Sequence, residues 1–234
     1  IKKRFIRTLM SKLTLLIPAN KEAESLPSVL GELASYDYQK LIVLQKEDEE
    51  TISSISNFKD IRICVQKNKG YGNALIEGLN SIDTEFFCII NADGSMDPKY
   101  LSEMLELCKN KDLVFASRYL EGGGSDDDNI ITLVGNKCFS FIGNILFKLN
   151  LTDILYTYVV GNTQSAKSLD LRYYDFRICV ELPILAKLNN LQFISTPSKE
   201  RKRIGGIKKV NALKDGFLIL TAIISLYLKK ILKK

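Results

Sequence analysis

Short apolar runs separated by helix-like stretches constrain the fold of this chain more than any other feature. Each run is five or six residues long and rich in Val, Ile, Leu or Phe. Such runs are typical of strands that are covered on both faces. The runs occupy 13–17, 40–45, 61–65, 85–90 and 112–117. Helices are predicted between them at 25–35, 51–57, 72–80 and 98–109, the last with Asp97 as its N-cap and Pro98 at its first position.

This alternation predicts an α/β fold with a mostly parallel central sheet and flanking helices. In such sheets ligands bind beyond the carboxyl ends of the strands, which points to the loops after residues 17, 45, 90 and 117. The second half is less regular. Helices are predicted there over 131–149 and 175–189, a strand over 191–196 and a final helix over 215–234.

The final predicted helix contains a 12-residue apolar run, Phe217–Leu228, followed by lysines. As a helix this run is roughly 18 Å long, whereas the hydrocarbon core of a bilayer is roughly 30 Å thick. A transmembrane span is therefore not expected. Two interpretations stay open: the helix lies in the membrane interface with its lysines at the headgroups, or it packs onto the sheet.

Charge is distributed unevenly along the 234 residues, although the net charge is only +6. Residues 199–234 hold eleven basic and two acidic residues (+9), residues 1–12 hold five basic residues and no acid (+5), and the remainder is −8. A nucleic-acid module usually spreads positive charge over its face, so this pattern argues against one. It favours ends that lie near phosphates or an anionic membrane. We expect a basic extension over 1–12, one α/β domain over 13–210 and a basic, apolar helix over 211–234, for which membrane association is one of the two interpretations.

The chain contains no histidine, which excludes a Ser-His-Asp or Cys-His centre, histidine-ligated zinc and a histidine base. Its five cysteines form no CxxC motif, so a reducing compartment without disulfides or structural zinc is expected. No secretory signal is recognised, which predicts a cytoplasmic protein. The first methionine is Met10, which leaves open whether residues 1–9 belong to the native chain.

The segment NADGSMDP, residues 91–98, carries the most chemical information. Asn91 and Asp93 follow an apolar strand at spacing i, i+2, and Gly94 permits a turn after them. Two oxygen ligands at a sheet's carboxyl edge suit Mg²⁺ or Mn²⁺, which would also hold the oxygens of a diphosphate. An ordinary capped turn explains the same residues, so the pattern alone leaves both interpretations open.

This segment resembles the metal-binding DxD segment of inverting family 2 glycosyltransferases, in particular the branch of dolichyl- and polyprenyl-phosphate sugar synthases. The resemblance runs from about residue 13 to 220. Four further segments match in the expected order: LIPANKEAESL (16–26) is similar to P-x-Y-N-E-x-x-x-L, NKGYGNALIEGL (68–79) to N-x-G-x-G-x-A-L-x-x-G, ASRYLEGGG (116–124) to G-S-R-Y-x-x-G-G, and ERKRIGGIKK (200–209) to E-R-x-x-G-x-S-K.

The resemblance implies the A-type glycosyltransferase fold of nucleotide-diphospho-sugar transferases. It also implies roles for individual residues. Asp93 would be the main ligand of Mg²⁺ or Mn²⁺, Asn91 a weaker one, and Ser95 would lie nearby. The nucleotide pocket would be lined by Pro18, Ala19, Glu22, Gly70, Gly72, Asn91 and Ala92, the two glycines letting the backbone approach the nucleotide. Arg118, Arg203 and Lys208 would meet phosphates of the donor or acceptor, the alternative being solvated surface charges.

The acceptor determines whether a catalytic base is needed. A phosphate acceptor is already ionised at neutral pH, whereas a sugar hydroxyl needs a base. Asp153 and Glu181 are the candidate bases, and each has a structural role as its alternative. Without a histidine, this difference modestly favours a phosphate acceptor.

The chain departs from the family pattern at several positions. Asn91 stands where the first DxD carboxylate is usual, which should weaken metal binding. Asn20-Lys21 replaces Tyr-Asn, Gln45-Lys46 follows the second strand without the usual aspartate, and Ile207 replaces a serine.

Three functions follow from these observations. We expect metal-dependent, inverting transfer of a sugar from a nucleotide-sugar to polyprenyl phosphate, at the cytoplasmic face of the membrane. The second is transfer to a sugar hydroxyl of a lipid-linked glycan in polysaccharide biosynthesis. The third is a degenerate domain that binds a nucleotide-sugar or a partner without catalysis.

Overall fold

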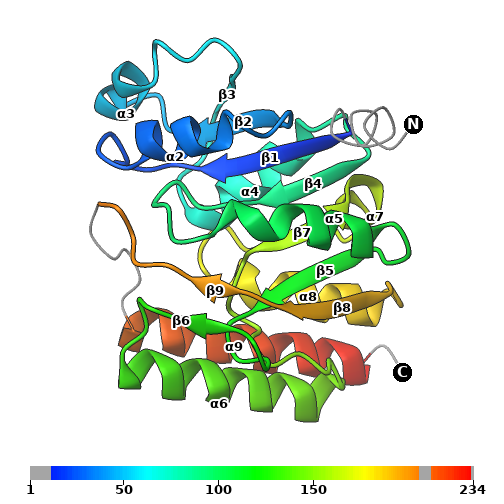
Figure 1. Cartoon of the computed structure of the whole chain (residues 1–234). Helices are drawn as coiled ribbons and strands as arrows, with labels where there is room; N and C mark the ends of the chain where they lie inside the picture. Colours follow the sequence, from blue (N-terminus) through cyan, green and yellow to red (C-terminus); the bar gives the residue numbers. More distant parts are fainter. Residues whose placement is uncertain (1–11, 206–211, 233–234) are drawn as a thin grey trace.

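A seven-stranded sheet with helices on both faces forms the molecule (Figure 1), and the computed structural model describes residues 12–205 and 212–232. The strand order is β3-β2-β1-β4-β7-β5-β8. Its strands are β3 (Arg62–Val65), β2 (Gln39–Leu44), β1 (Leu13–Pro18), β4 (Phe86–Ile89), β7 (Val159–Asn162), β5 (Leu113–Ser117) and β8 (Phe193–Pro197). A separate parallel pair consists of β6 (Gly124–Ser125) and β9 (Lys199–Glu200).

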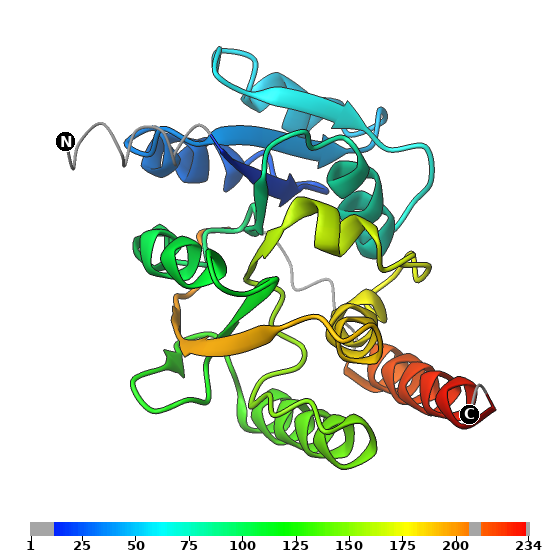
Figure 2. The ribbon, with the colours of Figure 1, turned by 90° about the vertical axis from the view of Figure 1, so that its right-hand side faces the viewer.

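The helices cover the two faces of this sheet (Figure 2). They are α2 (Leu26–Leu33), α3 (Glu49–Ser54), α4 (Tyr71–Asn80), α5 (Leu101–Cys108), α6 (Ile130–Phe147), α7 (Thr163–Lys167), α8 (Ile178–Leu188) and α9 (Ala212–Leu232), with a 3-10 turn at η1 (Pro98–Tyr100). Alternate side chains of β1 enter different cores: Leu16 packs on the face of α4 and α8, whereas Leu15 and Ile17 pack on the face of α2 and α5. The predicted α/β architecture is therefore confirmed.

The sheet is mostly parallel, as predicted, but one strand runs against the others. β7 lies between β4 and β5 and is antiparallel to both. The sequence analysis assigned no strand to residues 159–162, because four residues in an irregular region carry too little periodicity to be recognised. It also missed the short helix α7. Insertion of β7 joins β5 and β8 to the sheet, and only long-range pairing decides this.

The prediction that all five apolar runs are covered on both faces is wrong for 61–65. β3 is an edge strand in which Ile63 and Val65 are 45% and 48% exposed. The helix predicted over 98–109 begins with the 3-10 turn η1 rather than as an α-helix. Asp97 caps this turn by accepting a hydrogen bond from the backbone N–H of Lys99.

The C-terminal helix α9 packs against α8 and α6. Ile219, Ala222, Ile223 and Leu226 belong to the core on that side of the sheet. One face of α9 thus packs onto the body of the protein, which is one of the two interpretations of this segment. The other face of α9 is exposed, so packing alone does not account for the whole helix. The domain boundary at residue 211 stays a prediction.

Two glycines at the start of α4 allow a close contact with another part of the backbone. A Cβ at Gly70 would lie 2.1 Å from the carbonyl oxygen of Tyr174, and a Cβ at Gly72 would lie 2.1 Å from that of Tyr173. The backbone N–H of Asn73 donates to the Tyr174 carbonyl at 3.0 Å. Gly70 also has a φ of 120°, which favours glycine. The segment that approaches these glycines is therefore residues 173–175 of the chain itself.

We predict that Gly72→Ala destabilises the protein, because the new methyl group would clash with the backbone carbonyl oxygen of Tyr173. Overpacking of this kind costs about 1–3 kcal/mol. The matched control is Gly31→Ala in α2, where a Cβ meets nothing within 4 Å and the loss of helical glycine should stabilise by about 0.5–1 kcal/mol. Urea unfolding of both variants checks this. Equal stability of Gly72→Ala and the unmodified protein would contradict the close contact.

Candidate functional site

A cavity of about 600 Å³ lies at the carboxyl ends of the parallel strands. One end is lined by Pro18, Ala19, Gln45 and Gln66, which follow β1, β2 and β3. The other end is lined by residues near the N-termini of two helices, Thr132 and Asn136 of α6 and Lys214 and Ile219 of α9. The strands thus place the cavity where the sequence predicted a ligand site.

Most of the predicted site residues meet at this cavity. Those that line it are Pro18, Ala19, Glu22, Gly70, Asn91, Ala92, Asp93, Ser95, Arg118 and Arg203. Gly72, Asp153 and Glu181 do not line it. Lys208 lies outside the described residues.

Asp93 sits in a tight turn directly after β4. Its Oδ1 accepts two hydrogen bonds from Ser95, at 3.0 Å from the backbone N–H and 2.7 Å from the hydroxyl. The turn is possible because Gly94 has a φ of 78°. The backbone N–H of Ile204 donates to the Asp93 carbonyl at 2.8 Å, so the basic loop after β9 is held against this turn. Asp93 thereby presents its other carboxylate oxygen beside Arg203, whose Nη1 is 4.0 Å away.

Asn91 is held by an aromatic residue that also lines the cavity. The hydroxyl of Tyr71 donates to Asn91 Oδ1 at 3.3 Å and lies 2.6 Å from Thr157 Oγ1. The Tyr71 ring stacks on Phe176 with centroids 5.1 Å apart. Burial raises the pKa of Tyr71, so its hydroxyl stays protonated and able to donate. Asn91 is therefore an oriented amide beside Asp93.

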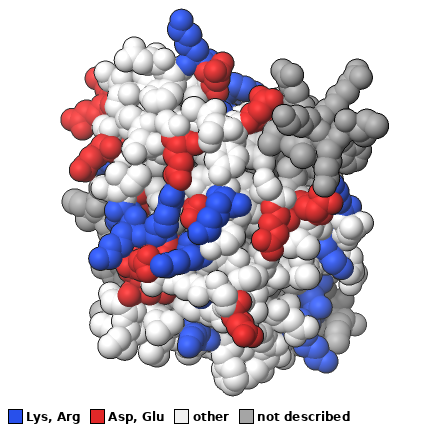
Figure 3. Space-filling view, in the orientation of Figure 1, with Lys and Arg blue, Asp and Glu red and all other residues white. Residues whose placement is uncertain are grey.

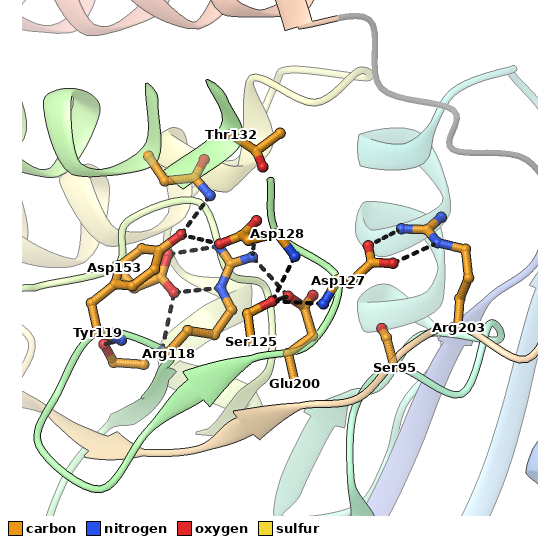
Figure 4. A network of polar contacts seen from close by, with 12 residues as sticks. Ser95, Arg118, Tyr119, Ser125, Asp127, Asp128, Thr132, Asp153, Glu200 and Arg203 are labelled. Carbon is orange, nitrogen blue, oxygen red and sulfur yellow. Dashed lines mark hydrogen bonds and ion pairs between the residues drawn. The ribbon is translucent and has the colours of Figure 1, made fainter. Parts of the chain in front are cut away.

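Arg118 lies at the centre of a buried network that joins distant segments (Figure 4). Its guanidinium contacts Asp153 twice, with Nε–Oδ2 2.7 Å and Nη2–Oδ1 3.0 Å, and Glu200 once, at 3.1 Å. Asp128 Oδ1 lies 3.6 Å from Nη1. Burial acts to lower the pKa of Arg118, but the hydrogen bonds and charge of Asp153 outweigh it and raise the pKa. The guanidinium is thus fully charged and already surrounded by carboxylates.

Asp153 is completely occupied by this arginine. Its side chain is 0% exposed, and its Oδ2 also accepts the backbone N–H of Arg118 at 3.2 Å. A base must reach the proton that it removes. The geometry therefore favours Asp153 as a counterion that positions Arg118, which is the structural alternative stated for it.

Glu181 is likewise engaged away from the cavity. Its carboxylate accepts the backbone N–H groups of Arg172 and Tyr173 at 2.9–3.1 Å. Burial raises the pKa of Glu181, and these two N–H groups oppose the rise. Since Tyr173 begins the segment that abuts Gly70 and Gly72, and Arg172 directly precedes it, Glu181 anchors this segment against the start of α4.

Arg203 is paired with Asp127, a residue to which the sequence analysis assigned no role. Its Nη2 lies 2.5 Å from Asp127 Oδ2, and this hydrogen bond is the main cause that raises the pKa of Arg203. Asp127 and Asp128 are ordered through their backbone N–H groups, which donate to the hydroxyl of Ser125. The run of three aspartates after three glycines was the available signal, but it does not identify their partners.

The charged residues described around the cavity are mostly acidic. Seven carboxylates line it against three basic side chains: Glu22, Asp93, Asp127, Asp128, Asp175, Glu200 and Asp215 against Arg118, Arg203 and Lys214. Within the described residues no group of three or more Asp, Glu or Cys side chains is placed to hold a metal ion alone. Mg²⁺ typically binds through one or two carboxylates together with substrate phosphates. Asp93 at an acidic cleft fits that mode.

The family model for glycosyl transferase family 2 matches residues 14–170. The chain therefore belongs to glycosyl transferase family 2, as its motifs predicted.

Curated relatives include polyprenyl-phosphate sugar transferases. An undecaprenyl-phosphate mannosyltransferase of Micrococcus luteus is 27% identical over 82% of this chain and 87% of its own length. A dolichol-phosphate mannosyltransferase of Pyrococcus furiosus is 24% identical over 77% and 54%. An uncharacterised glycosyltransferase of Mycobacterium tuberculosis is 33% identical over 45% of this chain, and the match spans about half (48%) of that relative.

Solved structures confirm the fold class. Glucosyl-3-phosphoglycerate synthase of Mycobacterium tuberculosis, solved with Mn²⁺, UDP and its product, superimposes with a TM-score of 0.71 over 94% of this chain and 81% of that one. The same enzyme in another structure gives 0.68. The sequence identity is 12% in both cases, so this likeness concerns the fold.

We predict that Asp153→Asn lowers the free energy of unfolding by about 3–5 kcal/mol, because it leaves a buried guanidinium without its main counterion. The control is Asp170→Asn, whose pair with Arg172 is solvent-exposed and should contribute little. Urea denaturation measures both. A variant that keeps full stability but loses activity would instead identify Asp153 as a base.

We predict that Glu181→Gln changes the pH dependence of stability. The folded-state pKa of Glu181 is raised, so its stabilising contribution is present below the unfolded pKa of about 4.3 and is lost as pH rises through the folded pKa. The glutamine variant has no such loss. Its stability relative to the unmodified protein should therefore increase from pH 4 to pH 7 in urea titrations, and a constant difference would contradict this.

Proposed function

We propose that this protein transfers a sugar from a nucleotide-sugar to polyprenyl phosphate, with Mg²⁺ or Mn²⁺ and with inversion at the anomeric carbon. The observation that carries the proposal is the two-ended cavity. Its strand end holds Asp93 and residues expected to contact a nucleotide, and its other end is lined by residues of α6 and α9. A donor and a lipid-linked acceptor would thus enter from opposite ends.

A divalent cation is supported by the charge of the cleft. A nucleoside diphosphate is itself anionic, and its binding beside a surplus of carboxylates needs compensating positive charge. Asp93 would be the protein ligand of the cation, and the oriented Asn91 a weaker one. When bound, the cation would neutralise charge on the departing diphosphate. The neighbour structure that contains Mn²⁺ and UDP supports this proposal by analogy of fold.

A phosphate acceptor is supported by the state of the two candidate bases. Asp153 is tied to Arg118 and Glu181 to a backbone loop. In the proposed reaction an ionised phosphate oxygen of the acceptor forms a bond to the anomeric carbon. The bond from that carbon to the donor diphosphate breaks, and its electron pair leaves with the diphosphate. No proton has to be removed from the acceptor, so neither carboxylate is required as a base.

The basic side chains would serve the phosphates in this scheme. Arg203 lies beside Asp93 and is paired with Asp127. It would release Asp127 and bind the donor diphosphate. Arg118 would contribute its charge to the cavity wall while held by its carboxylates. We place the catalytic domain at 13–210 and the protein at the cytoplasmic face of a membrane, where α9 would help to retain it.

We predict that Asp93→Asn lowers transfer to polyprenyl phosphate in detergent at least ~100-fold, which corresponds to ~2.7 kcal/mol in the barrier. The control is Asp83→Asn, an exposed aspartate that does not line the cavity. Assays with a panel of nucleotide-sugars, with Mn²⁺ and with EDTA, measure the effect. Full turnover in EDTA would overturn the role of the cation.

The third function, a non-catalytic domain, is motivated by Asn91 and is tested separately. Thermal-shift measurements with nucleoside diphosphates and Mn²⁺ should show stabilisation, because a ligand at a hundredfold excess over its Kd contributes ~2.7 kcal/mol. Asn91→Asp should strengthen Mn²⁺ binding by adding a carboxylate. Stabilisation without transfer in any assay would favour the degenerate domain.

A further inference from the structure

Helix α6 carries a continuous stripe of exposed apolar side chains. Its large members are 60–80% exposed and recur three or four residues apart, which places them on one side of the helix. They are Ile130, Ile131, Val134, Phe141 and Ile145, and Cys138 is the exposed residue between them. Among the described helices, α6 alone has the length and composition to cross a membrane, yet only 17% of it is buried. An exposed apolar stripe of this length on a protein surface indicates that the stripe binds a partner.

Helix α9 carries a second stripe and lies beside the first. Phe217, Ile224, Leu228 and Ile231 are 46–68% exposed, on the side away from its buried residues. Gly216 lies beside Phe139, whereas further along the Tyr227 ring meets Phe147, so the two helices run in the same direction. They form one end of the molecule (Figures 1 and 2).

The opposite face of α6 is engaged by the protein, which argues against a span. Phe147 belongs to the core. Asn144 exchanges two hydrogen bonds with the backbone of Leu151, at 2.8 and 3.1 Å. Thr132 and Asn136 line the cavity. A helix with one face packed and polar and the other apolar is suited to lie in an interface plane.

The charged residues near the two stripes indicate which kind of partner the stripes would bind. Residues 130–147 contain Lys137 and no acid, and Lys148 follows the helix. The last turns of α9 carry Lys229 and Lys230, of which Lys230 donates to the Leu146 carbonyl at 2.8 Å, and the acid of α9, Asp215, lies at its other end. In the view of Figure 3 the end formed by α6 is largely uncharged, with a few charged side chains scattered over it. Apolar stripes bordered by lysines complement anionic lipid headgroups.

We propose that α6 and α9 together form a docking surface for an anionic lipid bilayer, here called the α6/α9 surface. It consists of the exposed residues of the two stripes. This inference rests on the proposed function for its purpose, since residues in the N-terminal parts of the same two helices line the cavity. A lipid-linked phosphate could then enter the cavity while its hydrocarbon chain stays in the bilayer.

Cys138 offers a direct test, because it is the exposed cysteine of the five and lies within the α6 stripe. An environment-sensitive fluorophore on Cys138 should shift to the blue with phosphatidylcholine–phosphatidylglycerol vesicles, and less with phosphatidylcholine alone. The control places the label at the other end of the molecule, by Ser56→Cys in a Cys138→Ser background, and should not shift. Equal responses at the two sites, or none at Cys138, would overturn the proposal.

A pair of variants tests the apolar side chains themselves. Phe141→Ser with Ile145→Ser should reduce flotation with anionic vesicles at least tenfold. The matched control is Ile63→Ser with Val65→Ser, two similarly exposed apolar residues on edge strand β3. Flotation that the α6 variant leaves unchanged would overturn docking, as would a lipid-free dimer that this variant dissociates, because the occupant would then be a second copy.

The same variants separate docking from the proposed function. Neither Phe141 nor Ile145 lines the cavity. Stabilisation by nucleoside diphosphate with Mn²⁺, and transfer to polyprenyl phosphate in detergent, should therefore stay within twofold, while transfer to the same acceptor in vesicles falls at least tenfold. If the unmodified protein transfers no sugar to polyprenyl phosphate in detergent, the result counts against the proposed function and not against the α6/α9 surface.

Discussion

The buried charge of Arg118 is the interaction on which the part of the molecule around β6, β9 and the start of α6 depends. One guanidinium contacts Asp153 before β7, Glu200 in β9 and Asp128 at the start of α6. These residues lie up to 82 positions away in the sequence. Burying several charges is costly unless each is paired, and removal of one partner leaves the others uncompensated. The network therefore holds the loop before α6, strand β9 and the end of β5 in one arrangement.

This arrangement gives the cavity two different walls. On the side of the strand ends, Asp93 and Ser95 form a compact turn that is held by the loop after β9. On the other side, the same β9 pairs with β6, the strand that precedes α6 in the chain. Strand β9 thus connects the predicted metal ligand with the helices of the α6/α9 surface.

The local sequence was sufficient to predict most of the fold and the part of the cavity around Asp93. The apolar runs, the Asp97-Pro98 helix start and the Asp93 turn are read within a few residues of one another, and the structure shows all of them. The prediction failed for β7, whose four residues become a strand only by pairing with β4 and β5. It also failed for the coverage of β3, because an edge position is a property of the sheet and not of the strand.

The sequence alone determined the family, the α/β class and the position of Asp93, because these depend on local patterns and short spacings. Tertiary structure decided what the other charged residues do. Asp153 and Glu181 are the same residue types whether they act as bases or as anchors, and their burial and partners distinguish the two. It also decided that the stripes of α6 and α9 lie at one end of the protein. Such roles depend on contacts between residues far apart in the chain, which no local pattern records.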